Sequence, residues 1–89
     1  MLLTKAIEKQ LPELYGTEEI KTADKVLVVK YFKNNFTWYA IEFDPIERIF
    51  YGYVEGMENE WGYFSLDELQ SINVERDLYF DPIKFSELK

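Results

Sequence analysis

Hydrophobic and polar residues alternate over the middle of the chain in a pattern that predicts the strands of one antiparallel sheet. Residues 26–32 are a run of β-branched and aromatic residues, and residues 37–43 and 49–55 alternate at period two. Asn34-Asn35 and Asp44-Pro45 separate these runs, and both pairs are typical of tight turns. Because the turns are short, successive strands are expected to pair as a meander.

Two further segments extend the predicted sheet, and two short helices flank it. A fourth strand is predicted at 61–64, and residues 74–80 are predicted to form either an edge strand or an extended arm. Thr4 is a suitable N-cap for a helix over 4–11. Ser65-Leu66-Asp67-Glu68 is a capping box, which predicts a helix over 66–71. The expected fold class is therefore α+β, with an antiparallel meander of three to five strands, an N-terminal helix and a short helix after the fourth strand.

Strict alternation also assigns side chains to the two faces of the sheet. Gly52 is expected at a bulge or at a close approach of two backbones. In the strand 37–43, one face is predicted to carry Thr37, Tyr39, Ile41 and Phe43, and the other Trp38, Ala40 and Glu42.

Composition narrows the class of protein. A chain of 89 residues is one small domain, residues 1–89, and its seven Phe, seven Tyr and two Trp are expected to supply most of the core. The chain has no Cys and no His, which removes the usual zinc, iron and copper ligands and the nucleophile pairs built on them. We therefore expect no cofactor and no metal. The absence of Cys and of any long apolar run favours a cytoplasmic domain that does not enter a membrane.

Charge is unevenly distributed along the chain. Residues 40–82 carry eleven Asp and Glu against two Arg, a net of −9, while the whole chain carries −7. A phosphate backbone is bound by Lys and Arg, so direct binding of nucleic acid is not expected. An acidic surface instead favours a basic partner protein, or serves only to keep the protein soluble.

Three groups of residues in the chain are candidates for a chemical role. Glu42 and Asp44 near Trp38 are two carboxylates beside an indole, as in some acid–base sites, although a solvated strand end explains them as well. Arg76 is expected to be a structural tether paired to carboxylates. With Glu42 and Asp44 it could alternatively belong to a small enzyme or ligand-binding site.

The third group lies in one polar loop. Glu55, Glu58 and Glu60 are hard oxygen ligands, but their spacing does not match a calcium-binding loop, so a solvated acidic hairpin is expected. No phosphate-binding loop, nucleotide fingerprint or nucleophile elbow occurs in the chain. The sequence motifs therefore give no support to an enzymatic function.

Residues 50–56 and 60–69, with shorter segments in order along nearly the whole chain, form a recognisable pattern. This pattern is similar to a bacterial family known as domain of unknown function 2958. The family brings no catalytic residues, but the resemblance implies a small accessory protein of plasmids, integrative elements and phages. The other resembling segments are Leu2-Leu3-Thr4, Leu11-Pro12-Glu13-Leu14-Tyr15, Thr17-Glu18, Val29-Lys30-Tyr31-Phe32, Thr37-Trp38-Tyr39, Glu75-Arg76-Asp77-Leu78-Tyr79-Phe80 and Pro82.

Charge, aromatic content and this resemblance together lead to one working hypothesis. The protein is expected to be a non-enzymatic, acidic interaction module of a mobile genetic element, and an inhibitor of a host nucleic-acid-binding or defence protein is one form it could take. A small enzyme or ligand-binding domain and a structural accessory subunit of a transfer complex are the alternatives. The partner, the pathway and the oligomeric state stay open. The candidate partner-binding residues are Trp38, Glu42, Asp44, Glu55, Glu58, Glu60 and Trp61.

Overall fold

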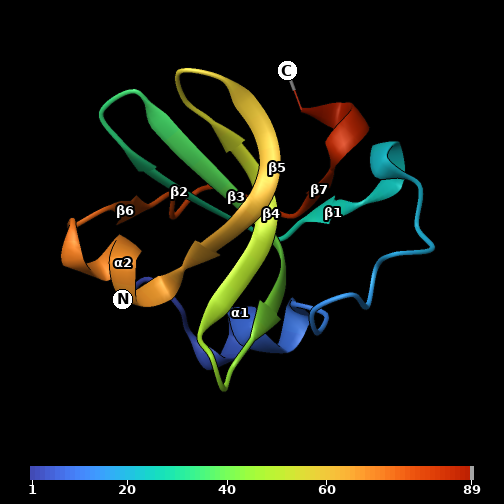
Figure 1. Cartoon of the computed structure of the whole chain (residues 1–89), viewed down its shortest axis with the longest axis horizontal. Helices are drawn as coiled ribbons and strands as arrows, with labels where there is room; N and C mark the ends of the chain where they lie inside the picture. The colour runs from blue at the N-terminus through green and yellow to red at the C-terminus, as the bar shows by residue number, and fades with distance from the viewer. Residues whose placement is uncertain (89) are drawn as a thin grey trace.

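The computed structural model describes residues 1–88, and its main feature is a five-stranded antiparallel sheet (Figure 1). The strand order is β5-β4-β3-β2-β6, so strands β2 to β5 form a meander and β6 returns to the opposite edge. A second sheet pairs two short strands, β1 and β7. This α+β arrangement confirms the predicted fold class. The strands are β1 Val26–Leu27, β2 Val29–Lys33, β3 Phe36–Asp44, β4 Ile49–Glu55, β5 Asn59–Ser65, β6 Glu75–Arg76 and β7 Ile83–Lys84.

Turn residues end the strands where the sequence predicts. Asn34 adopts a positive φ of 53° between β2 and β3, which Asn tolerates better than most residues. After β3, the Asp44 side chain accepts a hydrogen bond from the Ile46 amide at 3.0 Å, and Arg48 takes a φ of 58°. Both hairpin predictions are confirmed, and β4 has the predicted bounds.

A bulge in β3 overturns part of the predicted face assignment. Ala40 pairs with Gly52 but Glu42 pairs with Tyr51, so Ile41 is an extra residue in β3. The extra residue moves Glu42 to the face of Tyr51, and it moves Phe43 to the face of Ala40. The predicted positions of Glu42 and Phe43 are therefore wrong, because strict alternation does not survive a bulge.

Gly52 explains why the bulge fits. A Cβ atom on Gly52 would lie 1.8 Å from the Tyr39 carbonyl oxygen, so the two backbones approach too closely for any other residue. The predicted close approach at Gly52 is confirmed, and the bulge itself lies opposite, on β3.

The predicted strand 26–32 is interrupted. Val28 lies between β1 and β2, and its amide donates to the Ala40 carbonyl at 2.9 Å. Before Val28 the chain is outside the large sheet, and β1 pairs with β7 through Val26–Lys84 and Leu27–Ile83. The resulting two-stranded unit, the β1–β7 clasp, holds the C-terminal segment against the sheet.

Each face of the large sheet carries its own hydrophobic cluster. On the first face, α1 Lys5–Gln10 and α2 Leu66–Ser71 flank a core that includes Tyr31 and Phe50, both fully buried. On the second face, the clasp and the short helix η2 Phe85–Glu87 cover Tyr39 and aromatic neighbours on β4 and β5. A further short helix, η1 Thr22–Asp24, precedes the clasp.

Side-chain caps fix the start of both α-helices. The Thr4 hydroxyl accepts from the Ile7 amide at 3.1 Å, and the Ser65 hydroxyl accepts from the Glu68 amide at 3.2 Å. Both predicted helices are confirmed. None of the helices in residues 1–88 is long and apolar enough to cross a membrane.

Candidate functional site

Glu42 anchors an irregular loop and is only 4% exposed. Its carboxylate accepts hydrogen bonds from the Tyr15 amide at 2.9 Å, the Thr17 amide at 3.1 Å and the Thr17 hydroxyl. Lys25 completes the network by donating to the Thr17 carbonyl and hydroxyl. The oxygens of Glu42 are thus committed to holding residues 15–17, and the side chain is not part of an exposed partner-binding face.

The geometry does not join Glu42 and Asp44 into an acid–base pair with Trp38. Asp44 caps the turn after β3, as described above. Trp38 is six residues from Asp44 along an extended strand, which corresponds to roughly 20 Å. Trp38 also packs on the first face, whereas Glu42 pairs with Tyr51 of the second face.

Arg76 is a tether, but its partner differs from the predicted carboxylate. Its Nε donates to the Met1 carbonyl oxygen at 3.1 Å. The neighbouring Asp77 instead makes the ion pair of this segment, with Lys30 Nζ at 3.6 Å, and it accepts from the Tyr79 amide at 2.9 Å. The expectation that Arg76 pairs with carboxylates is therefore wrong, because the strand geometry directs Arg76 toward the N-terminal segment.

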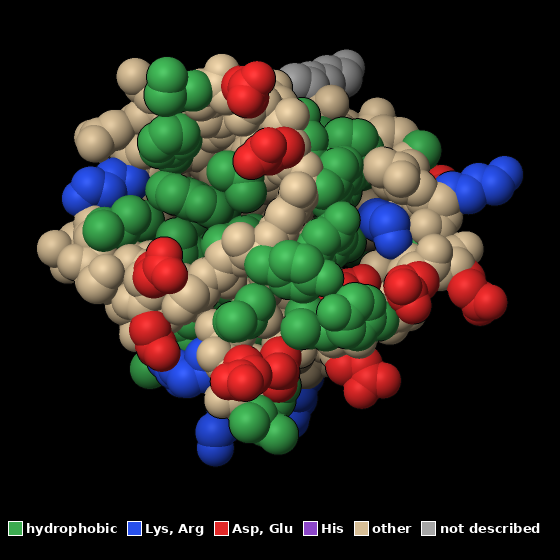
Figure 2. All heavy atoms as spheres, viewed as in Figure 1, with side chains coloured by type: hydrophobic (Ala, Val, Ile, Leu, Met, Phe, Trp, Pro, Cys, Tyr) green, Lys and Arg blue, Asp and Glu red, His purple; other side chains and the backbone are tan. Residues whose placement is uncertain are grey.

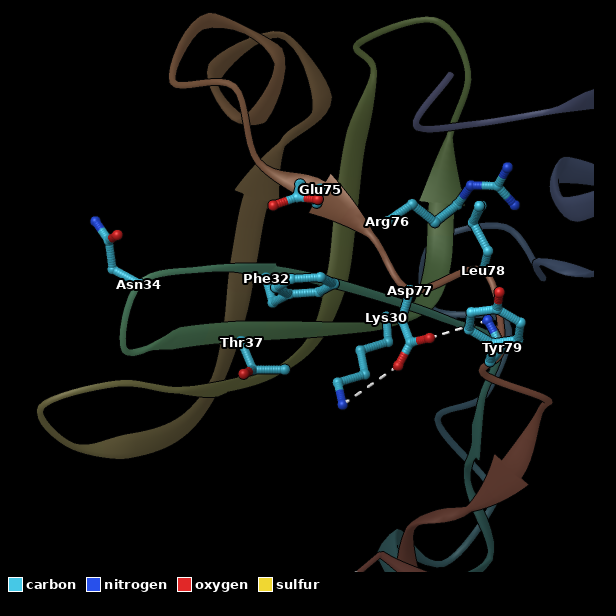
Figure 3. A pocket seen from close by; sticks show the side chains of 9 residues that line it. All are labelled: Lys30, Phe32, Asn34, Thr37, Glu75, Arg76, Asp77, Leu78 and Tyr79. Carbon is cyan, nitrogen blue, oxygen red and sulfur yellow. Dashed lines mark hydrogen bonds and ion pairs between the residues drawn. The ribbon is translucent and has the colours of Figure 1, made fainter.

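The same segment borders an open hollow of about 510 Å³ between β2 and the arm after β6. Figure 3 shows Lys30 and Phe32 beside Asp77, whereas Arg76 and Leu78 point away from them. The Lys30 amine and the Asp77 carboxylate in this lining neutralise each other, and the remaining charges of the lining, Glu75 and Arg76, are of opposite sign.

Trp38 and Trp61 lie on opposite faces of the sheet. Trp61 packs into the second-face cluster, with its ring centroid 5.2 Å from Tyr53 and 5.0 Å from Phe85. Trp38 packs at the margin of the first-face cluster, with its ring 5.8 Å from that of Phe36. The two predicted anchors therefore cannot belong to one contact surface.

The three carboxylates of the hairpin loop spread around its tip. Glu60 pairs with Val54 and shares the first face with Trp38, while Glu55 pairs with Thr37 on the second face and Glu58 lies in the turn. Within residues 1–88, no group of three carboxylates is placed so that it could hold a metal ion.

A groove of about 440 Å³ on the first face brings predicted and unpredicted residues together. It runs along β5 and the start of α2. Gly62 leaves an opening in its wall, because a Cβ atom there would have no neighbour within 4 Å. Of the predicted residues, only Trp38 and Glu60 line this groove. Its lining is Trp38, Ile49, Val54, Glu60, Gly62, Tyr63, Phe64, Ser65 and Glu68.

Acidic side chains dominate the charge around this groove. Glu58, Glu60, Asp67 and Glu68 are all exposed. The nearby cation Arg48 is already engaged, since its Nε lies 2.8 Å from Asp67 Oδ1. Figure 2 is drawn in the orientation of Figure 1, in which β5 crosses the front of the molecule. It shows hydrophobic side chains across the middle of this view and carboxylates around them.

Two tyrosines of the second face titrate above their ordinary range. Burial, followed by the nearby Glu55 carboxylate, raises the pKa of Tyr39 to about 12. A hydrogen bond with Tyr15 raises the pKa of Tyr63 to about 12 as well. Tyr39 is buried in the second-face cluster, whereas the Tyr63 ring is exposed.

The model of a family described as "Protein of unknown function (DUF2958)" matches residues 2–86. The chain belongs to this family. The predicted resemblance is confirmed over residues 2–86 of the 89-residue chain. No curated protein and no solved structure gave a significant match.

Proposed function

We propose that the protein is a non-enzymatic interaction module that binds a basic surface of another protein. The binding surface is the β5 side, defined as the β5 edge of the sheet with Glu58, Glu60 and Glu68 around it. One observation carries the proposal: Glu58, Glu60 and Glu68 are exposed around one edge of the sheet. Among residues 1–88, none of these three takes part in an ion pair. Charges left free at a rim accelerate association with an oppositely charged partner.

Such a partner has a natural chemical class. A protein that grips DNA phosphates presents Lys and Arg at regular spacing, and an acidic surface can occupy that site in place of DNA. The proposed role is therefore inhibition of a host nucleic-acid-binding or defence protein. An accessory role on a mobile genetic element would fit the family resemblance described above.

The test is affinity purification of the tagged protein from its native cell, with three baits in parallel. The wild type is compared with Glu58→Lys/Glu60→Lys/Glu68→Lys and with a matched variant, Glu8→Lys/Glu13→Lys/Glu19→Lys. The matched variant changes the net charge equally but alters exposed positions on and after α1. A protein recovered by the wild type and the matched variant, but not by the first triple variant, is expected.

Salt and DNA provide the second measurement on the recovered partner. Binding should weaken as salt rises above the physiological level, where the Debye length falls below about 8 Å, and DNA should compete. Equal recovery by the β5-side triple variant, or an affinity that does not change with salt, would overturn the proposal. Salt-sensitive binding without DNA competition would leave the acidic surface in place but assign it to a structural complex.

A further inference from the structure

The outer edge of β5 is an unused row of hydrogen-bonding groups. The Gly56 amide donates to the Glu58 carbonyl at 3.3 Å, and the Leu66 amide donates to the Arg48 carbonyl at 3.0 Å. In an antiparallel pair, bonded positions alternate, so the even-numbered residues of β5 face β4. The backbone groups of Asn59, Trp61 and Tyr63 therefore point outward. No hydrogen bond within the described residues 1–88 involves them.

This edge lacks the usual protection against pairing. Natural sheets protect their edges with Pro, charged side chains (Lys above all), a bulge or a very short strand, and β5 carries a single charge, that of Glu60. The opposite edge follows that rule, since β6 is only Glu75–Arg76 and continues into an arm. β5 spans seven residues, contains neither Pro nor Lys, and pairs with β4 without a register shift.

The groove on the first face lies where an added strand would place a side chain. Directly opposed residues on neighbouring strands share a face, so the residue opposite Gly62 would project beside it, into the opening described above. Glu60 and Glu68 line that groove together with the Trp38 ring. Carboxylates and an indole together suit Lys or Arg, through ion pairing and cation–π contact.

We propose that an extended basic segment of a partner protein adds to β5 as a further antiparallel strand and places a Lys or Arg side chain in the groove beside Gly62. This rests on the proposed function and specifies how the acidic side is used. Backbone hydrogen bonds supply affinity in such strand addition, and alternate side chains supply specificity.

Charge selects this occupant over a second copy of the chain. Two β5 strands paired with each other would bring Glu58, Glu60 and Glu68 of both copies to one interface, on molecules that each carry −7. Like charges brought together in this way oppose association. A basic segment carries the opposite charge and would reduce the repulsion among these three carboxylates.

The probe is a fluorescent synthetic peptide of alternating Lys and Thr, about as long as β5, measured by fluorescence anisotropy against the intact protein. In antiparallel pairing, with Lys opposite Glu60 and Gly62, the Thr amides point toward β5 and the Lys amides point away. N-methylation of the Thr positions should therefore abolish binding. N-methylation of the Lys positions should leave the affinity within about threefold, a difference below 1 kcal/mol.

Two pairs of protein variants test the same geometry from the other side. Tyr63→Pro removes an outward amide, whereas Tyr63→Ala removes only the ring, so we expect the Pro variant to bind at least about tenfold more weakly than the Ala variant. Glu60→Gln/Glu68→Gln should weaken binding of the Lys peptide, whereas Glu8→Gln/Glu19→Gln should not. Circular dichroism confirms that each variant is folded before binding is measured.

The outcomes separate the two proposals. Equal effects of both N-methylation patterns, or no binding of the Lys peptide, would overturn strand addition, and the affinity purification would still decide on the acidic surface. A control peptide has Gln in place of every Lys. If it binds as tightly as the Lys peptide, the acidic surface is not used and the proposed function fails as well. A dimer in analytical ultracentrifugation that Tyr63→Pro abolishes would assign the edge to a second copy and overturn the proposal.

Discussion

Replacing Glu42 by Ala tests whether one buried carboxylate holds the loop that follows α1. The carboxylate accepts from the Tyr15 amide, the Thr17 amide and the Thr17 hydroxyl. Thr17 is 5% exposed, so its two donors cannot turn to water without opening the loop. Glu42→Ala therefore leaves at least two buried donors without an acceptor.

The expected loss follows from the cost of each unpaired group. A buried donor left unsatisfied costs about 1–3 kcal/mol, so two cost about 2–6 kcal/mol. A domain of this length has a total stability of about 4–13 kcal/mol. The substitution should therefore remove a large part of the stability. Glu42→Gln should cost less, because its amide oxygen still accepts while its NH₂ group faces another donor.

Urea unfolding followed by circular dichroism measures the loss, and hydrogen exchange measures the loop directly. The Thr17 amide should exchange faster in Glu42→Ala than in the wild type. Glu47→Ala is the control, because Glu47 is exposed in the turn after β3 and should change stability by no more than about 0.5 kcal/mol. A loss below about 1 kcal/mol for Glu42→Ala, with unchanged exchange at Thr17, would refute the assignment.

Three further predictions concern the scaffold. Ser65→Ala should cost about 0.5–2 kcal/mol in urea unfolding, because the Glu68 amide loses its cap, and no loss would mean that the hydroxyl does not stabilise α2. Gly52→Ala should cost at least about 3 kcal/mol, because its Cβ would meet the Tyr39 carbonyl. Gly62→Ala, the matched change, should leave stability equal or raise it by up to about 1 kcal/mol, and similar losses in both would contradict the packing described. Tyr39 titrates at about 12 instead of 10.0, so its stabilising contribution is intact below pH 10.0 and lost as pH rises toward about 12. The tyrosinate absorbance difference between the wild type and Tyr39→Phe measures that step, and a midpoint near 10.0 would contradict it.

Local signals in the sequence were sufficient for the hairpins and the helices. Alternation bounded by turn residues predicted β4 at 49–55, and the capping box predicted α2. The bulge at Ile41 was not predictable, because it depends on the fit of β3 against Gly52 on another strand. The break at Val28 depends on β7, which is far away in the sequence.

The groove was predictable only in part. Trp38 and Glu60 stood out as an aromatic residue and a loop carboxylate, and both line the groove. Gly62 and Glu68 were missed as site residues, because Gly62 matters through the side chain it lacks and Glu68 had already been assigned to the capping box. Glu42 was chosen for its charge, but its burial depends on a loop with no periodic pattern.

The β1–β7 clasp implies an order of events in folding and in local opening. The clasp joins Val26 to Lys84, so closing it costs the entropy of a long loop and gains only a few backbone hydrogen bonds. The hairpins of β2 to β5 instead join segments that are adjacent in the sequence. The clasp should therefore form after the meander and open before it. Because Trp61 packs under this segment against Phe85 and Trp38 lies on the other face, the two indoles should report separate events. Under mild denaturant, Trp61 fluorescence should respond first, as a sub-global unfolding that leaves the meander and Trp38 in place.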